Sequence, residues 1–170
     1  MLNQRFNYCF EYGKNAEVRF AESFLTDFNY STKYQDIHEH WDVAGVLTNI
    51  LYKPMKFDVK SAPRLKHSPT AGIMESVWVE GTNVSGNKGW VKGNADYIVF
   101  ERENTWMIVN RIDLLNLTTQ KLQENNFKKG KGDYKKSTAY LIHTRAGRKD
   151  KVTQVVFDDM KTIHHYEVNK

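Results

Sequence analysis

Residues 41–60 read W-D-V-A-G-V-L-T-N-I-L-Y-K-P-M-K-F-D-V-K, and this stretch predicts two strands joined by a turn. The apolar run after Asp42 ends before the turn, and the second strand-like run ends in Asp58-Val59-Lys60. Because side chains alternate across a strand, Asp58 and Lys60 point to the same face. If the two strands pair as a hairpin, Asp42 reaches that face too.

Two carboxylates and one ammonium group in a small space favour a particular chemistry. Carboxylates that lie close together repel each other unless a cation sits between them. A divalent metal with hard oxygen ligands meets that need, so Asp42 and Asp58 are candidate ligands. The alternative is that these residues are solvated polar positions on two edge strands, because an Asp-x-Lys tripeptide occurs by chance in many proteins.

Charge is distributed unevenly along the chain. The whole sequence carries a formal net charge of +5. Residues 1–60 contain seven Lys/Arg and eight Asp/Glu, whereas residues 119–151 contain ten Lys/Arg and three Asp/Glu. An acidic pocket beside a basic surface suits a metal-dependent enzyme that acts on a polyanion. The alternative is that the basic segment is a solvated loop that promotes solubility.

Length and composition predict one globular domain over residues 1–170, since the chain has 170 residues and 40% hydrophobic residues. Cys9 is the only cysteine, which excludes an intrachain disulfide, disfavours a cysteine-based zinc site and suits a reducing compartment. The N-terminus has no apolar signal region, and no apolar run approaches the length of a membrane span. We therefore expect no membrane contact and a cytoplasmic protein, in the host cytoplasm if a phage encodes it.

Residues 14–29 predict an amphipathic helix. Glu17 lies beside its apolar stripe, where the carboxylate is either held towards a metal or placed favourably for the helix dipole. Glu22, on a different face, is the rival candidate. The predicted stripe consists of Val18, Ala21, Leu25 and Phe28.

Residues 30–40 predict a loop or a short strand that contains His38-Glu39-His40. This tripeptide lacks the four-residue helical spacing of zinc-protease motifs. We therefore expect His38 and His40 to be surface residues, and His164-His165 near the C-terminus likewise.

The second half of the chain alternates strand-like runs with turns. Residues 61–75 predict a polar loop, residues 76–80 a third strand whose last residue, Glu80, is a candidate additional acid, and residues 81–94 a glycine-rich turn segment. Further strands are expected at 95–101, 105–110, 138–144 and 152–157, with a closing edge strand at 165–168. A helix is expected over residues 111–125, with a stripe of Ile112, Leu115, Thr119 and Leu122.

Basic side chains interleave with aromatic ones in residues 127–136, which read F-K-K-G-K-G-D-Y-K-K. This mixture suits contact with a phosphate backbone and exposed bases. Basic residues in the loop before the third strand and after residue 144 extend the prediction. The candidate DNA-binding residues are Arg64, Lys66, Lys128, Lys129, Lys131, Lys135, Lys136, Arg145 and Arg148.

An acid on a first helix (Glu17), an Asp that opens a strand (Asp42) and an acid-x-Lys on the next strand (Asp58-Val59-Lys60) resemble the PD-(D/E)XK nuclease superfamily. Residues 78–101 and 144–153 resemble a subgroup of small, phage-type, Holliday-junction-resolvase-like members. Trp41 stands where the name-giving proline would be, and Asp58 replaces the commoner Glu.

This resemblance implies a restriction-endonuclease-like core of αβββαβ order within a mixed α/β fold. It implies that Asp42, Asp58 and the backbone carbonyl of Val59 bind Mg²⁺ or Mn²⁺, and that Glu17 binds metal directly or through water. It also implies that Lys60 holds and helps to deprotonate the attacking water.

The function that follows is a metal-dependent DNA endonuclease. Structure-specific cutting of branched DNA or Holliday junctions is one version, since a small chain without a separate recognition domain suits shape reading. Nicking or restriction-like activity and an exonuclease are others, and a homodimer is an open option. The alternative is a non-catalytic nucleic-acid-binding protein on a nuclease-like fold, although a pure binder has no reason to cluster acids near a polyanion.

Overall fold

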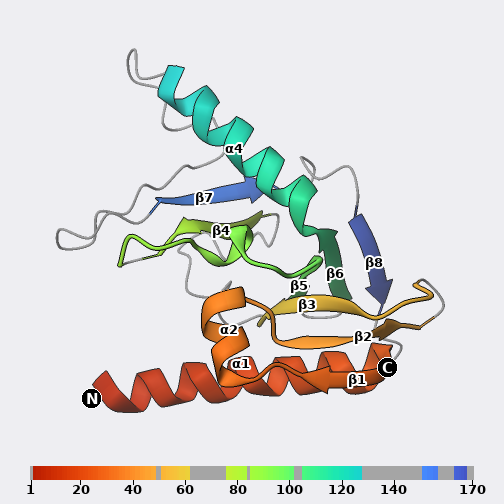
Figure 1. Ribbon diagram of the computed structural model, residues 1–170. Coiled ribbons are helices and arrows are strands. Elements are labelled where there is room, and N and C mark those ends of the chain that lie inside the picture. The colour runs from red at the N-terminus through yellow and green to blue at the C-terminus, as the bar shows by residue number, and fades with distance from the viewer. Residues whose placement is uncertain are drawn as a thin grey trace.

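The computed structural model describes seven segments of the chain, residues 2–48, 51–61, 76–83, 85–101, 105–127, 151–156 and 163–167. They form helices and strands in a mixed α/β arrangement, which confirms the expected fold class (Figure 1). The elements in chain order are α1 (Leu2–Phe24), β1 (Leu25–Tyr30), α2 (Lys33–Glu39), β2 (Val43–Leu47), β3 (Met55–Lys60), β4 (Ser76–Thr82), the 3₁₀ turn η1 (Trp90–Lys92), β5 (Tyr97–Glu101), β6 (Thr105–Asn110), α4 (Arg111–Phe127), β7 (Lys151–Val156) and β8 (Ile163–Glu167).

The strands form two sheets. Six strands pair in the order β1-β2-β3-β5-β6-β8, and β4 pairs with β7 in a separate sheet of two strands. All pairings are antiparallel except that of β3 with β5, which is parallel. β3 therefore lies inside the larger sheet, with a hydrogen-bonded neighbour on each side.

The centre of the larger sheet is buried on both faces, because alternate residues of β5 enter different cores. On β5, Val99 packs into the core that includes Phe20 of α1, whereas Ile98 and Phe100 pack into the core that includes Val79 of β4. Figure 1 shows the same arrangement, with α1 along one side of the sheet and β4, β7 and α4 on the other. Strands buried on both faces read as continuous apolar runs, as the sequence of β5 does.

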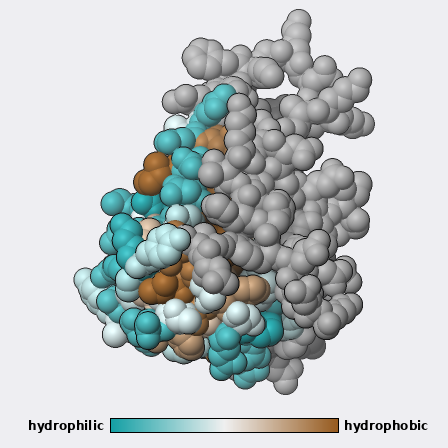
Figure 2. Space-filling view, turned by 90° about the vertical axis from the view of Figure 1, so that its right-hand side faces the viewer, coloured by the Kyte–Doolittle hydropathy of each residue, from teal (hydrophilic) through white to brown (hydrophobic). Residues whose placement is uncertain are grey.

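Seen from the right-hand side of Figure 1, the described surface is mostly hydrophilic (Figure 2). Hydrophobic residues gather in one area at the level of the β2–β3 hairpin, and hydrophilic residues border it. Within the described segments, no helix combines the length and apolar character that crossing a membrane requires.

The expected helix over residues 14–29 is wrong at both ends. α1 begins at Leu2 and ends at Phe24, and the chain then enters β1, which pairs with β2. Pairing with β2 satisfies the backbone of residues 25–30, and this tertiary contact outweighs the helical pattern. Leu25 is still buried, but Phe28 is 37% exposed rather than part of a helical stripe.

Residues 30–40 contain a helix where a loop or strand was expected. α2 begins after Thr32, whose hydroxyl accepts a hydrogen bond from the backbone N–H of Gln35, while the Gln35 side chain accepts one from the Thr32 N–H. This reciprocal capping box satisfies two backbone donors that the helix start would otherwise leave free. α2 ends at Glu39, and the C-cap residue His40 adopts a left-handed conformation with φ of 56°.

The helix over residues 111–125 exists as α4, but its predicted apolar stripe is only partly right. Among the side chains described in this helix, up to residue 120, Leu114 and Thr118 are buried one turn apart, and Leu115 is partly buried against the same core. Ile112 is 47% exposed and Thr119 is exposed, and the Leu122 side chain lies outside the described ones. Thr118 is accommodated inside because its hydroxyl donates to the Leu114 carbonyl at 2.6 Å. A threonine that satisfies its own hydroxyl within the helix can occupy a core position.

Most predicted strands are present, but the third has an unexpected partner. The hairpin of β2 and β3, the antiparallel pair of β5 and β6, and an edge strand at β8 are confirmed. β4 pairs with β7 rather than joining the sheet of β2 and β3. The predicted strand over residues 138–144 lies outside the described segments. Because β1 and α2 intervene before β2, the αβββαβ core stays a prediction.

Candidate active site

α1 places Glu17 at a pocket that the hairpin also lines. The Glu17 side chain is 15% exposed, and its Oε2 accepts a hydrogen bond from Lys14 Nζ at 2.8 Å, one turn away on the same helix. Glu22, the rival acid, is exposed and does not line this pocket. The choice of Glu17 therefore agrees with the helix face that the structure turns towards the hairpin.

The register of β2 and β3 brings Asp42 and the Asp58-Val59-Lys60 segment together. Val43 pairs with Phe57, and the Asp42 backbone N–H donates to the Phe57 carbonyl at 2.8 Å. The Asp42 side chain then reaches along β3, where its Oδ2 accepts a 2.6 Å hydrogen bond from the Val59 N–H. The hairpin thus fixes the Asp42 carboxylate through the backbone of both strands.

Asp58 and Lys60 share one face of β3, as strand alternation predicts. Lys60 Nζ forms an ion pair with Asp58 Oδ1. The other oxygen, Oδ2, is buried and finds no hydrogen-bond partner in the parts of the chain that are described. A buried carboxylate oxygen without a hydrogen bond costs folding free energy and is rare in proteins, which suggests that it has a ligand.

The acids of the site raise one another's proton affinity. Burial raises the pKa of Asp42 to about 8, and the nearby charge of Asp58 adds to this effect. Burial, followed by the charge of Asp42, raises the pKa of Glu17 to about 7. Both raised pKa values mean that ionising these carboxyl groups is unfavourable in the site as it stands. A cation among the carboxylates would lower both pKa values.

A cavity of about 590 Å³ opens beside the acids. Residues of α1, α2 and β3 form its walls, and Asp42 contributes from the start of β2. Asp58 is only 2% exposed and does not line the cavity, although it contacts Lys60, which does. The lining residues are Gly13, Lys14, Glu17, Ser31, Lys33, Asp36, Ile37, Asp42, Val59, Lys60 and Ser61.

Lys60 has an aromatic partner as well as an acidic one. Its Nζ lies 4.8 Å from the ring centroid of Trp90, in the 3₁₀ turn η1. Two glycines allow this turn to approach. A Cβ on Gly89 would lie 2.2 Å from the Glu80 carbonyl oxygen, and a Cβ on Gly93 would lie 2.5 Å from the His40 Cβ. The glycine-rich segment of residues 81–94 therefore carries Trp90 to the site.

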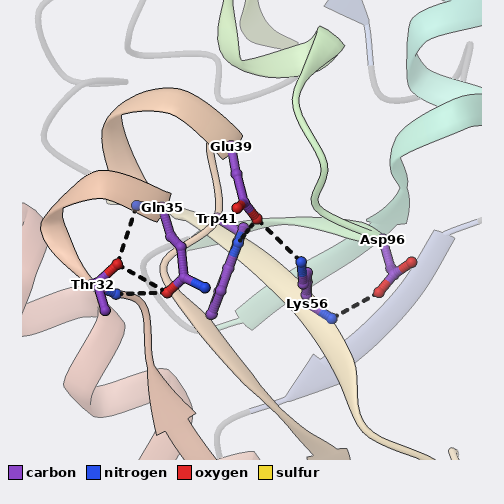
Figure 3. Close-up of polar contacts among 6 residues, drawn as sticks. All are labelled: Thr32, Gln35, Glu39, Trp41, Lys56 and Asp96. Carbon is purple, nitrogen blue, oxygen red and sulfur yellow. Dashed lines mark hydrogen bonds and ion pairs between the residues drawn. The ribbon is translucent and has the colours of Figure 1, made fainter.

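The turn into Asp42 is held by a polar contact network (Figure 3). Glu39 Oε2 accepts hydrogen bonds from Trp41 Nε1 at 2.8 Å and from Lys56 Nζ at 3.2 Å. Lys56 Nζ also lies 4.9 Å from the Trp41 ring centroid, and the Lys56 N–H donates to Asp96 Oδ2 at 2.8 Å. Trp41 thus supplies a buried anchor at the position where the nuclease pattern has proline, and Asp96 is a structural hydrogen-bonding partner.

Several predicted residues do not belong to this site. Glu80 lies on β4 and does not line the cavity. The His38 ring contacts the Tyr34 ring of α2 at a tilt of 40°, and His40 caps the C-terminus of that helix; neither histidine lines the cavity. All nine candidate DNA-binding residues, from Arg64 to Arg148, lie outside the described segments.

Sequence reasoning missed the α2 wall of the cavity. Lys33, Asp36 and Ile37 line it, together with Ser31 just before the helix. The signal was available in Thr32-Lys33-Tyr34-Gln35, which has the Thr-x-x-Gln spacing of a capping box. That motif predicts a helix start, and hence three neighbouring side chains on one helical face.

The residues present fit a hard divalent cation. Asp42, Asp58 and Glu17 offer carboxylate oxygens, the donors that Mg²⁺ and Mn²⁺ prefer, and one Asp58 oxygen lacks a partner within the described part of the chain. Across the segments that the structure describes, no three His, Cys, Asp or Glu side chains stand ready-made as a metal site. Glu17 would have to leave Lys14 before it joined the two aspartates.

No family model, no curated protein and no solved structure matches this chain. The resemblance to PD-(D/E)XK nucleases therefore depends on the residues themselves and on their arrangement.

Proposed function

We propose that this protein is a metal-dependent deoxyribonuclease that hydrolyses phosphodiester bonds in the cavity between α1, α2 and β3. The observation that carries the proposal is the pair of buried carboxylates, Asp42 and Asp58, with one Asp58 oxygen unpartnered in the described structure and Lys60 beside it. A buried pair of acids is costly for a protein that only folds or only binds a polyanion. A bound cation would explain why two acids are buried side by side.

The acids would share the work of holding Mg²⁺ or Mn²⁺. Asp42 and Asp58 would be the main ligands, the Val59 carbonyl a further one, and Glu17 a direct or water-mediated one. When bound, the cation would activate the attacking water and neutralise the charge that builds on the phosphate. The Asp42–Val59 hydrogen bond orients one carboxylate before substrate arrives, so little reorganisation is needed at that ligand.

Lys60 would supply the remaining positive charge at the reacting phosphate. Its ammonium contacts Asp58 and faces the Trp90 ring, which together restrict where Nζ lies. An ammonium held there would orient the attacking water and stabilise the negative charge that develops as the water loses its proton to the solvent. Lys14 and Lys33 line the same cavity and would contact the neighbouring phosphates.

The test is incubation of the purified protein with supercoiled plasmid, linear duplex, single-stranded and four-way-junction DNA in Mg²⁺, Mn²⁺ or EDTA. We expect cleavage of at least one substrate with either metal and none in EDTA. The double variant Asp42→Asn, Asp58→Asn is the control for contaminating nuclease, since it removes two proposed ligands and keeps the side-chain sizes. Equal cleavage by this variant and the parent would overturn the proposal.

A further inference from the structure

Exposed aromatic and aliphatic side chains lie on β1 and α2, in the same part of the chain as the cavity-lining residues Ser31, Lys33 and Ile37. Within the described segments, Phe28, Tyr30, Tyr34 and Ile37 are 37%, 36%, 67% and 52% exposed, and they fall within ten residues of one another. Exposed apolar groups that cluster in this way mark interaction sites, whereas scattered ones need no explanation. We call Tyr30, Tyr34, Ile37 and His38 the aromatic rim.

The aromatic rim adjoins the candidate active site through one of its members. Ile37 lines the cavity, whereas Tyr30, Tyr34 and His38 do not, although their chain neighbours Ser31, Lys33 and Ile37 do. The Tyr34 and His38 rings lie one turn apart on α2, with their centroids 4.4 Å apart. Tyr30 approaches the cavity through Lys14, whose Nζ lies 5.0 Å from its ring centroid. The rings therefore lie next to, and outside, a cavity that is lined by lysines and acids.

The charge and the volume of the cavity indicate which ligand could bind there and reach the aromatic rim. Lys14, Lys33 and Lys60 face into the cavity, so a chain of phosphates finds cations along it. The volume of about 590 Å³ lies within the range of sites that bind a small organic ligand, and it exceeds the needs of a phosphate alone. Rings beside such a cavity offer stacking surfaces to a nucleobase.

Only an unpaired base can use those surfaces. In a duplex, both faces of each internal base are covered by stacked neighbours, and a protein reads only the base edges in the grooves. An unpaired base exposes its faces, and aromatic side chains bind them with little dependence on sequence. The rim therefore matches single-stranded or branched DNA and offers nothing comparable to an intact duplex.

We propose that the aromatic rim receives an unpaired nucleobase of a DNA strand whose backbone enters the cavity, with the base stacked on the Tyr34–His38 ring pair. The inference rests on the proposed nuclease function and names its substrate class, which is DNA with unpaired nucleotides next to the cleaved phosphate. Tyr34 acts as a specificity residue, because it touches the base and not the reacting phosphate.

Binding without cleavage is the first test. Fluorescence anisotropy of the full chain in EDTA compares a single-stranded oligonucleotide, a flap and a blunt duplex. We expect Tyr34→Ala to weaken binding of the strand and flap about fivefold or more, and Tyr34→Phe to keep it, since stacking needs only the ring. Duplex binding should change less than twofold. Tyr52→Ala is the matched control, because Tyr52 is 100% exposed, between β2 and β3, and does not line the cavity.

A second test does not depend on how the variants fold. The parent protein is cross-linked by light to a single-stranded oligonucleotide that contains one 5-iododeoxyuridine, and mass spectrometry locates the adduct. We expect the adduct at Tyr34 or His38. An adduct elsewhere, equal losses for strand and duplex in Tyr34→Ala, or a loss of the same size in Tyr52→Ala would each overturn the inference.

The two proposals fail in different ways. If the parent cleaves DNA in Mg²⁺ but Tyr34→Ala binds and cuts the flap as the parent does, the nuclease proposal stands and the rim inference falls. If the parent cleaves no DNA, yet Tyr34→Ala selectively loses single-strand binding in EDTA, the rim inference stands as a binding site and the nuclease proposal falls.

Discussion

The carboxylate of Asp42 and the backbone N–H of Val59 lie seventeen positions apart in the chain and are joined by a 2.6 Å hydrogen bond. This bond ties the acid that opens β2 to the strand that carries Asp58 and Lys60. At 2.6 Å it is a short N–H···O hydrogen bond. The site therefore depends on the hairpin register, because a slip of one residue would turn Asp58 and Lys60 to the opposite face of the sheet.

Asp58→Ala and Lys60→Ala should both reduce DNA cleavage by at least about a hundredfold, which corresponds to roughly 3 kcal/mol of transition-state stabilisation. They should differ in metal binding, followed by calorimetry. Asp58→Ala removes a ligand and should weaken Mg²⁺ binding, whereas Lys60→Ala removes a nearby positive charge and should leave the affinity equal or higher. Weaker metal binding in Lys60→Ala would contradict the assigned roles.

The metal-free protein should lose stability as pH rises, because burial raises the pKa of Asp42 to about 8. Between the ordinary aspartate pKa and this value, the folded state binds a proton that the unfolded state has released. Stability is then highest below the unfolded pKa and falls by up to about 1.4 kcal/mol per pH unit until pH 8 is passed. Thermal melts in EDTA from pH 5 to 9 measure this trend.

Asp42→Asn is the matched control for that trend, since an amide does not titrate. It should melt with a flatter pH profile than the parent, and Mg²⁺ should raise the melting temperature of the parent more than that of the variant at pH 8. A profile as steep as the parent's would assign the pH dependence to another group, with Glu17 the first candidate.

Glu17→Gln should lower the cleavage rate by about tenfold or more, while Glu22→Gln should change it less than twofold. Glu17 lines the cavity, and Glu22 lies exposed on another face of α1. The pair is well matched, because both changes remove one charge from the same helix. The comparison uses initial rates at saturating Mg²⁺, and the reverse ranking would assign the metal to the wrong helix face.

Trp90→Leu should lower the maximal cleavage rate by roughly three- to tenfold, in line with the usual strength of a cation–π contact, and should change the KM for DNA much less. Trp90→Phe keeps an aromatic face and should recover much of the loss. A second measurement needs neither metal nor DNA. Acylation of Lys60 by an amine-reactive reagent, normalised to Lys56, should rise in Trp90→Leu, because Lys60 loses the ring 4.8 Å from its Nζ. No change in either measurement would contradict a positioning role.

The basic segment gives a prediction from sequence alone. If Lys128, Lys129 and Lys131 contact phosphates, changing all three to Ala should flatten the log–log salt dependence of DNA affinity by about two to three, and should weaken all sequences alike. Anisotropy titrations from about 50 to 200 mM salt measure the slope. An unchanged slope would mean that the DNA path runs elsewhere, past Arg64 and Lys66 for example.

The hairpin and its acids were predictable because strand alternation and a Lys-Pro turn are local signals. The end of α1 was not, since the stripe continues through Leu25 while the backbone leaves the helix to pair with β2. The bulge there, with Asp27 at a φ of 48°, depends on that pairing rather than on any local preference.

The strand that pairs with β4 could not be predicted from the sequence either. Val77 and Val79 alternate with other residues and predict a strand, but nothing local says that the strand pairs with β7, more than seventy residues later. The contact between Trp90 and Lys60 was missed for the same reason. The glycine spacing indicates a turn but does not indicate which part of the protein the turn contacts. Long-range pairing decides both, and only the folded chain reveals it.

β3 has one further consequence, which follows from its place between β2 and β5. Residues 55–57 of β3 pair with β2 and residues 57–60 pair with β5, so hydrogen exchange there should need separation from an inner neighbour of the sheet, whereas the edge strand β1 can fray by itself. Asp58 and Lys60 therefore lie on a strand that we do not expect to unfold separately from the sheet. On heating, the Asp58–Lys60 pair and the tertiary structure should be lost in a single transition, and no partly melted form of the protein should retain a formed site.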